Sequence, residues 1–375
     1  MKLPLLVLAM CPWFAAGTPV LSPQAPASAT EVVELAPLLE PLRAKHSLPA
    51  LGGAIVAEGK LVALGACGER ELGGGVVVSS NDLWHLGSCT KAMTATLAAR
   101  LVEQGKIRWD TSVESAFPQW KEKLHADWRA TTLEQLLTNR GGAPGSAPRE
   151  LWIALGSRAG TSQENRTWFV GELLKLEPEA PAGTKFIYSN QGFTIAGAML
   201  EAATGKSWED LMRSELFGPL GMASAGFGAP GSADAVDQPR GHTKKPVKPG
   251  PRADNPAAIG PAGTVHASLA DWAKFASAHL EGARGEGKFL KPESWKKLHT
   301  AATGQDYAMG WGTAERSWAG GGTLSHSGSN TMWFCTIWLA PEKGEAYLVT
   351  TNTGADVAAK ACDEAVGALI ASRKK

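Results

Sequence analysis

The sequence predicts an α+β fold, an α/β sandwich in which an antiparallel sheet is flanked by the N- and C-terminal helices and carries an inserted all-helical lobe. Two observations support this. Strand-like segments stand near both ends of the chain, and residues 111 to about 227 between them are rich in helical patterns. At 375 residues the chain is long enough to bury a large core in two lobes.

Each element is indicated by its own local pattern. An amphipathic run predicts a helix over residues 31–46, and it is followed by a strand hairpin, 54–57 and 61–64, around the turn at 58–60. Residues 330–339 and 347–351 predict a second hairpin, and 356–372 a closing helix. In the middle of the chain, Thr131-Thr132-Leu133-Glu134 has the form of a capping box that opens a helix.

These elements predict one domain over residues 30–372. Its sheet lobe comprises residues 30–110 and 258–372, and its helical lobe comprises residues 111–257. We expect a functional site in the cleft between the lobes.

The most informative local motif is Ser88-Cys89-Thr90-Lys91 at the start of an amphipathic run. A serine hydroxyl needs a base nearby to act as a nucleophile, and residues three apart on a helix share a face, so Lys91 can reach Ser88. The motif alone is weak, because Ser294-Trp295-Lys296-Lys297 and Ser372-Arg373-Lys374-Lys375 share its spacing.

Two later motifs give the first one its context. Tyr188-Ser189-Asn190 is the only Tyr-x-Asn in a chain with three tyrosines, and His326-Ser327-Gly328 begins a strand-like segment. A second His-x-Gly, His85-Leu86-Gly87, precedes the serine, and we interpret it as packing around the turn.

The ordered trio Ser-x-x-Lys, Tyr-x-Asn and His-x-Gly resembles the serine β-lactamase and penicillin-binding superfamily, in its class C β-lactamase, D-alanyl-D-alanine carboxypeptidase and esterase branch. The resemblance covers roughly residues 31–370 and implies that superfamily's fold and its acyl-transfer chemistry, without naming the substrate. It includes further landmarks in family order: Pro181-Ala182-Gly183, Pro219-Leu220-Gly221-Met222, Gly260-Pro261-Ala262-Gly263 and Met309-Gly310-Trp311-Gly312.

The resemblance implies catalytic roles for Ser88, Lys91 and Tyr188. Ser88 would attack a carbonyl and form an acyl-enzyme. Tyr188, with its pKa lowered by the charge of Lys91, would share proton transfer with that lysine, and which of the two is the base stays open. Asn190 would orient Lys91 and an amide on the acyl side of the substrate.

The strand that carries His326 is implied to bind the substrate. The backbone N–H groups of Ser88 and Ser329 would form an oxyanion hole, and Gly328 would keep the strand open. Class C β-lactamases carry Lys-Thr-Gly here, whereas a histidine near its usual pKa of about 6.5 is mostly neutral at pH 7. His326 therefore favours a carboxypeptidase or esterase over a true β-lactamase, and its alternative interpretation is a structural histidine. The alternative function is a non-catalytic or slow-turnover penicillin-binding sensor module.

Composition and motifs exclude several other classes of function. A net charge of +1 with 19% charged residues disfavours a nucleic-acid partner and leaves a small-molecule or peptide substrate. The sequence contains no Gly-x-Ser-x-Gly elbow, and no phosphate-binding loop surrounds Gly205-Lys206-Ser207. We expect no cofactor, and a monomer.

The cysteines do not indicate a metal site. The cysteines beyond the expected signal peptide are Cys67, Cys89, Cys335 and Cys362. No Cys-x-x-Cys motif and no neighbouring histidine accompanies them, so the sequence indicates neither a metal site nor a redox motif. Their disulfide state stays open, with one disulfide possible.

The N-terminus has the pattern of a secretory signal. Lys2 is followed by an apolar run over residues 3–16, too short to span a bilayer, so residues 1–29 are expected to be a signal peptide and tether. Cleavage after Ala29 and cleavage near Ala16 both stay open. Lipid attachment at Cys11 is disfavoured because Met10 is bulky. The mature chain is expected to be periplasmic or secreted, without stable membrane insertion.

Overall fold

The computed structural model describes residue 1 and residues 32–374, and the chain divides into two units, Met1–Glu31 and Val32–Lys375. The expected signal peptide, its cleavage sites and Cys11 lie outside the described residues. In the described part of the chain, no helix is both long and apolar enough to cross a membrane.

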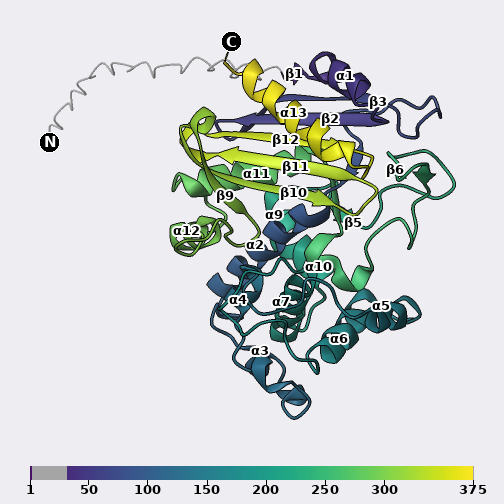
Figure 1. The fold of residues 1–375 in the computed structure, drawn as a ribbon. Coiled ribbons are helices and arrows are strands. Elements are labelled where there is room, and N and C mark those ends of the chain that lie inside the picture. Colours follow the sequence, from purple (N-terminus) through teal and green to yellow (C-terminus); the bar gives the residue numbers. More distant parts are fainter. Residues whose placement is uncertain (2–31, 375) are drawn as a thin grey trace. The chain divides into compact units, whose positions relative to one another are not determined.

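A seven-stranded sheet with the order β1-β3-β2-β12-β11-β10-β9 forms the core of the second unit (Figure 1). Neighbouring strands are antiparallel except for β1 and β3, which are parallel. The strands are β1 (Val33–Glu34), β2 (Ala50–Ala57), β3 (Lys60–Gly68), β9 (Gly312–Arg316), β10 (Gly321–Ser329), β11 (Phe334–Ala340) and β12 (Glu345–Thr351).

Helices cover both faces of this sheet. All eight residues of β2 are buried, and they alternate between two cores because successive side chains of a strand point to opposite faces. Ala54 belongs to the core shared with α11 (Leu269–Ala283), whereas Ile55 packs in the core formed with α1 (Ala36–Lys45) and α13 (Val357–Ser372). This confirms the predicted sheet flanked by terminal helices.

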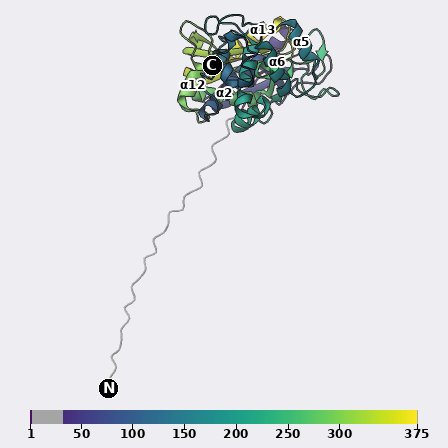
Figure 2. The ribbon, with the colours of Figure 1, turned by 90° about the horizontal axis from the view of Figure 1, so that it is seen from below.

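The helices of the central part of the chain lie below the sheet in Figure 1. Figures 1 and 2 place α12 on one side of α2, and α5 and α6 on the other. The helices other than α1, α11 and α13 are α2 (Thr90–Glu103), α3 (Val113–Ala116), α4 (Leu133–Leu137), α5 (Arg149–Gly156), α6 (Ser162–Leu173), α7 (Asn190–Thr204), α8 (Trp208–Leu211), α9 (Gly218–Leu220), α10 (Gly260–Gly263) and α12 (Pro292–His299).

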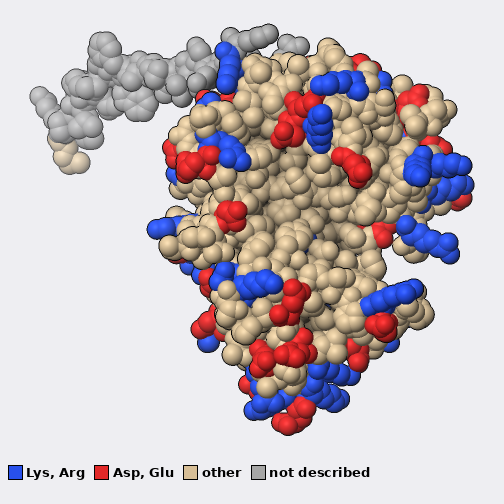
Figure 3. All heavy atoms as spheres, viewed as in Figure 1, with Lys and Arg blue, Asp and Glu red and all other residues tan. Residues whose placement is uncertain are grey.

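The segment between α9 and α10 contains strands, so the all-helical stretch ends earlier than the predicted residue 257. Strand β5 (Gly226–Phe227) pairs with β8 (Val265–Ser268), which in turn pairs with β4 (Leu83–His85). Strands β6 (Gly241–His242) and β7 (Pro246–Val247) form a small ribbon whose connecting residues include the exposed Lys244 and Lys245. On the face shown in Figure 3, positive and negative side chains are intermixed.

Several predicted boundaries were wrong: strands β2 and β3 of the first hairpin are each four or more residues longer than predicted, and β12 begins two residues earlier. Three other differences have a cause in the contacts. Helix α1 begins at Ala36 rather than residue 31, because residues 33 and 34 pair with β3. Strand β11 begins at Phe334 rather than residue 330, because the side chain of Asn330 accepts two backbone N–H groups and closes a turn. The capping box lies one residue later than predicted and joins Thr132 to Gln135, since Thr132 is the residue with extended backbone before α4.

Candidate active site

Ser88 lies where β4 turns into the buried helix α2. The turn passes through a single 3-10 turn, Gly87–Cys89, in which Gly87 has a positive φ of 46°. Ser88 is partly exposed while both of its neighbours are buried. The chain therefore presents one hydroxyl at the surface of a rigid element, at a helix N-terminus that favours negative charge.

Lys91 is fully buried beneath Ser88 and has three oxygen partners. Its Nζ donates to Ser88 Oγ at 3.1 Å, to Asn190 Oδ1 at 2.7 Å and to the carbonyl of Ala262 at 2.9 Å. Among the described residues no carboxylate forms an ion pair with it. Burial without an opposite charge disfavours the ammonium form, and it lowers the pKa of Lys91 to about 7.

Two landmark segments hold this lysine in place. Helix α10 supplies the Ala262 carbonyl, and the preceding carbonyl, that of Pro261, accepts a hydrogen bond from Thr94 on α2. On another side of α2, Gly310 has a positive φ of 78° and lies so close to the backbone of Lys91 and Ala92 that a side chain would collide with it.

Tyr188 and Asn190 reach the site from the start of α7. Ser189 caps that helix by accepting from the Gly192 N–H, and its own N–H donates to Asn139 Oδ1. The Tyr188 ring centroid lies 4.7 Å from Lys91 Nζ. The structure thus places both residues beside Lys91.

The expected pKa of Tyr188 was wrong in direction. Desolvation by the surrounding protein raises the pKa of the phenol to about 12, and contact with Ser88 offsets only part of this effect. The side chain keeps 41% of its surface exposed, so solvent limits the size of the shift. Lys91 with its depressed pKa is mostly uncharged above pH 7, and it therefore does not supply the permanent positive charge that the expectation assumed.

Strand β10 lies directly against the Ser88 turn. A Cβ on Gly87 would collide with the backbone N of Ser329, and one on Gly328 would collide with the carbonyl of Leu86 and lie 2.9 Å from the backbone N of Ser88. Only glycines permit this approach. The segments that carry the backbone N atoms of Ser88 and Ser329 therefore lie directly against each other, and the oxyanion hole formed by these two amides stays a prediction.

His326 is neutral in this arrangement. Its Nδ1 lies 2.7 Å from the Ser327 carbonyl, which only accepts, so Nδ1 carries the proton and Nε2 accepts from the Tyr307 hydroxyl at 3.4 Å. Desolvation by the surrounding protein and the nearby Lys91 lower the pKa of His326 to about 3, below the predicted value near 6.5. The residue is partly exposed, so solvent limits the size of this shift. Tyr307 was missed by the sequence analysis; its only signal is that it stands two residues before the Met309 landmark.

The competing candidates Ser294 and Cys89 are both buried. Ser294 is buried on α12, and Lys297 of the same helix pairs with Glu134 at 2.8 Å. Cys89 Sγ lies 3.6 Å from Cys335 Sγ without a bond, and all four described cysteines are free. Residues 1 and 32–374 contain no cluster of His, Cys, Asp and Glu suited to a metal ion.

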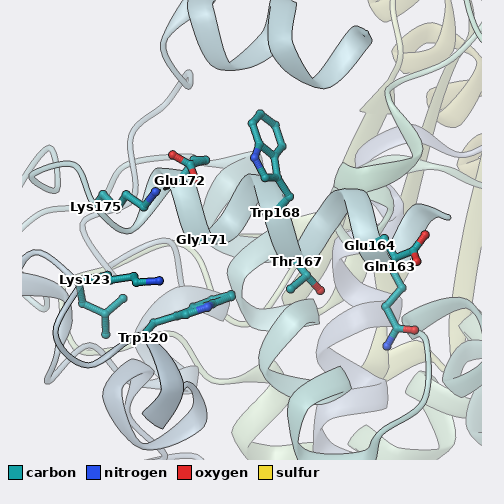
Figure 4. A pocket seen from close by; sticks show the side chains of 10 residues that line it. Trp120, Lys123, Gln163, Glu164, Thr167, Trp168, Gly171, Glu172 and Lys175 are labelled. Atoms are coloured by element: carbon teal, nitrogen blue, oxygen red, sulfur yellow. Dashed lines mark hydrogen bonds and ion pairs between the residues drawn. The ribbon is translucent and has the colours of Figure 1, made fainter. Parts of the chain in front are cut away.

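A separate cavity of about 490 Å³ lies along α6 (Figure 4). Trp120 and Trp168 line it together with Gly171, and none of the candidate site residues does. It therefore plays no part in the chemistry assigned to Ser88.

Comparison with known proteins supports the same family as the motifs. The Beta-lactamase family matches residues 35–371, almost all of the described domain. The chain belongs to the beta-lactamase family. The resemblance seen in the sequence is thus confirmed, and this beta-lactamase family member is a serine hydrolase in the broad sense of that family.

Individual relatives of this beta-lactamase family chain carry several names. It is 28% identical over 326 residues to Penicillin-binding protein 4 of Amycolatopsis lactamdurans, covering 84% of this chain and 83% of that one. It is 27% identical over 296 residues to Unguisins hydrolase ungD' of Aspergillus campestris, covering 74% of this chain and 53% of the relative.

Solved structures match the fold. A class C beta-lactamase superposes with a TM-score of 0.73 at 20% identity, covering 91% of this chain and 95% of the other. The octameric penicillin-binding protein homologue from Pyrococcus abyssi superposes with a TM-score of 0.71 at 23% identity, covering 90% and 77% of the two chains. The predicted α+β fold is confirmed.

Proposed function

We propose that this protein hydrolyses esters or amides through an acyl-enzyme on Ser88, and that it is an esterase or D-Ala carboxypeptidase rather than mainly a β-lactamase. The observation that carries the proposal is the set of contacts at Lys91 Nζ, which lies 3.1 Å from Ser88 Oγ.

The partners of Lys91 decide where its lone pair points. The Asn190 amide oxygen and the Ala262 carbonyl can only accept, so in the neutral amine they take both N–H groups. The lone pair then remains for the third partner, the Ser88 hydroxyl. With its pKa lowered to about 7, Lys91 is free to accept that proton at neutral pH.

The reaction follows from this arrangement. Ser88 Oγ forms a bond to the substrate carbonyl carbon while its proton moves to Lys91 Nζ, and the negative charge on the carbonyl oxygen is met by the backbone N–H groups of Ser88 and Ser329. The carbonyl re-forms as the bond to the leaving group breaks, and the leaving group takes up a proton. Water then attacks the acyl ester by the same steps and regenerates the Ser88 hydroxyl.

Tyr188 acts in this scheme as a protonated phenol. Because the pKa of its hydroxyl is raised, it donates or relays a proton to the leaving group and does not serve as a phenolate base. Lys91 and Tyr188 remain one proton-handling unit, with the lysine as the base.

The substrate preference rests on His326. A neutral imidazole whose Nε2 already faces Tyr307 offers no permanent positive charge on β10. A substrate carboxylate, which both a β-lactam and the C-terminus of a D-Ala-D-Ala peptide carry, would meet only hydrogen bonds there. Of the two proposed activities, the neutral His326 therefore favours the esterase, and the carboxypeptidase rests on the resemblance of the motifs alone. The name of the Amycolatopsis lactamdurans relative supports a second candidate, a penicillin-binding module that acylates and turns over slowly.

One panel of substrates tests these candidates. Turnover is compared for a short-chain p-nitrophenyl ester, a D-Ala-D-Ala peptide and a chromogenic β-lactam, and the adduct of a fluorescent penicillin or a fluorophosphonate is mapped by mass spectrometry. We expect the adduct on Ser88 and the highest specificity constant with the ester. Ser88→Ala should abolish turnover, and Ser294→Ala, the control from a matched Ser-x-x-Lys, should not. An adduct on Ser294 or on Cys89 would overturn the assignment.

Two further proposals concern the whole protein. From the N-terminal sequence we propose that the chain is exported without lipid attachment. We also propose that it acts as a monomer. Fractionation of expressing cells with intact-mass analysis tests the first, and light scattering tests the second.

A further inference from the structure

His85 is a buried histidine that the proposed reaction does not use. It is the last residue of β4, three positions before Ser88, and its side chain is fully buried. Its Nδ1 accepts the backbone N–H of Gly87 at 3.1 Å. An accepting Nδ1 carries no proton, so the ring proton lies on Nε2.

That second nitrogen meets Asp254. His85 Nε2 lies 2.7 Å from Asp254 Oδ1, in a close polar contact that departs from linear hydrogen-bond geometry. The carboxylate comes from the loop before α10, and only 7% of its side chain is exposed. The Gly87 N–H at Nδ1 and the Asp254 carboxylate beside Nε2 thus contact the His85 ring at both nitrogens, an arrangement common for the second partners of functional histidines.

The same carboxylate holds the end of β10. Asp254 Oδ1 accepts from Asn330 Nδ2 at 3.0 Å, and Asn330 Oδ1 accepts the backbone N–H groups of Met332 and Trp333. Asn330 directly follows Ser329, whose N–H is one half of the proposed oxyanion hole. Asp254 is therefore linked on one side to the turn before Ser88 and on the other to the residue after Ser329.

We propose that His85 is a positioning residue, and that His85, Asp254 and Asn330 form a brace that sets the separation of the Ser88 and Ser329 amides. The inference rests on the proposed function, since it assigns the brace to the oxyanion hole of the same site. An oxyanion hole acts through preorganised hydrogen-bond donors. A small displacement of one amide therefore reduces the stabilisation of the transition state more than it reduces the binding of the substrate.

A purely structural role is the competing explanation. Asp254 Oδ2 is buried and finds no hydrogen-bond partner among the described residues, which costs stability. Apolar side chains in place of His85 and Asp254 would therefore stabilise the fold at least as well as this polar pair does. A test must therefore separate loss of stability from loss of amide placement.

Three variants make that separation. His85→Asn retains an acceptor near the position of Nδ1, and His85→Leu retains none. His266→Gln is the control, because His266 is the residue paired with His85 across β4 and β8, and its ring contacts Gly228 rather than the Ser88 turn. For each variant we measure kcat and KM with a short-chain p-nitrophenyl ester, the rate constant for fluorophosphonate labelling of Ser88, and the thermal midpoint.

We expect His85→Leu to lower kcat and the labelling rate by about 10-fold, less than the 100-fold to 1000-fold loss seen when an oxyanion donor is removed outright. KM should change by less than about 3-fold, as expected when ground-state binding is intact. His85→Asn should recover most of the loss and His266→Gln should match the wild type. Equal rates in His85→Asn and His85→Leu, at equal thermal midpoints, would overturn the proposal.

The labelling experiment separates a failure of the proposed function from a failure of the brace. A wild-type protein that is not labelled at Ser88 would refute the proposed function, whereas normal labelling in both His85 variants would refute only the brace. If His85→Leu does not fold, Asp254→Asn tests the same link, because it keeps the size of the side chain and removes its charge. An unchanged kcat in that variant would equally overturn the brace.

Discussion

Replacing Asn190 with Asp is expected to move the acid limb of the activity profile to higher pH. The change is nearly isosteric and places a carboxylate 2.7 Å from Lys91 Nζ. In the wild type, burial lowers the pKa of Lys91 from 10.5 to about 7, so about half of the amine is free at pH 7 instead of roughly 0.03%. We therefore expect wild-type kcat/KM to rise about tenfold per pH unit below pH 7 and to level off above about pH 8.

The size of the shift follows from the short distance. Two unit charges 2.7 Å apart attract by about 6 kcal/mol at an effective dielectric constant of about 20, which is an upper limit because the new carboxylate must itself be desolvated. Measured effects of such pairs on pKa are about 1–3 units. The midpoint should then lie between about pH 8 and 10, and activity at pH 7 should fall about 5-fold to 500-fold.

The assay is kcat/KM for a neutral p-nitrophenyl ester between pH 5.5 and 10, followed at the isosbestic wavelength of the product. Ser88→Ala supplies the uncatalysed background, and thermal midpoints show whether the fold tolerates the new carboxylate. A midpoint that stays near pH 7 in Asn190→Asp would show that the limb does not belong to Lys91. A flat wild-type profile over this range would refute the base assignment altogether.

Three other changes test separate parts of the structure. Tyr188→Phe should lower kcat by about 100-fold or more and leave the fall in activity below pH 7 unchanged. The double variant with Lys91→Met should be little worse than either single variant. Strict additivity of the two losses would mean that the two residues act independently. His279 and His299 are buried with their pKa values lowered, so the unfolded chain binds protons that the folded one does not, and the free energy of unfolding should fall as pH falls from about 6.5 toward 4. His299→Gln preserves a donor to His279 and should flatten this dependence in urea denaturation at pH 7 and 5, whereas unchanged slopes would remove His299 as its source. Gly87→Ala should lower kcat by more than about 100-fold together with the thermal midpoint, because its Cβ would strike the Ser329 amide; a fully active variant would mean that the two segments are not in contact.

Local patterns predicted most of the fold, and they failed where a tertiary contact overrode them. The sheet and its terminal helices could be predicted because strands such as β2 and β12 have clear apolar runs. The start of α1 could not, because residues 33 and 34 form a strand through their pairing with β3, and the local apolar pattern does not reveal this contact. The helical lobe was extended too far because the two-residue strands β5 to β7 have no periodicity to detect.

The site shows a similar division. Order and spacing of the motifs placed Ser88, Lys91 and Asn190 together, since each motif sits at the end of a regular element. Protonation states were not predictable, because desolvation depends on what surrounds a group, and so the expected pKa directions for Tyr188 and values for His326 were wrong. His85 was assigned to packing for the same reason: nothing in the sequence reveals that Asp254, 169 positions later, contacts it.

The two thiols beside the nucleophile bear on how this protein would tolerate oxidants. Cys89 Sγ and Cys335 Sγ are 3.6 Å apart, so a disulfide at about 2.05 Å would draw the first turn of α2 toward β11 and disturb the serine that precedes Cys89. Oxidation proceeds through the thiolate, and burial raises the pKa of Cys89 well above its ordinary value. In an oxidising compartment, which export would imply, the pair would stay reduced because it reacts slowly. Heating or partial unfolding, by exposing both sulfurs, would then convert a reversible loss of structure into a cross-linked and inactive enzyme.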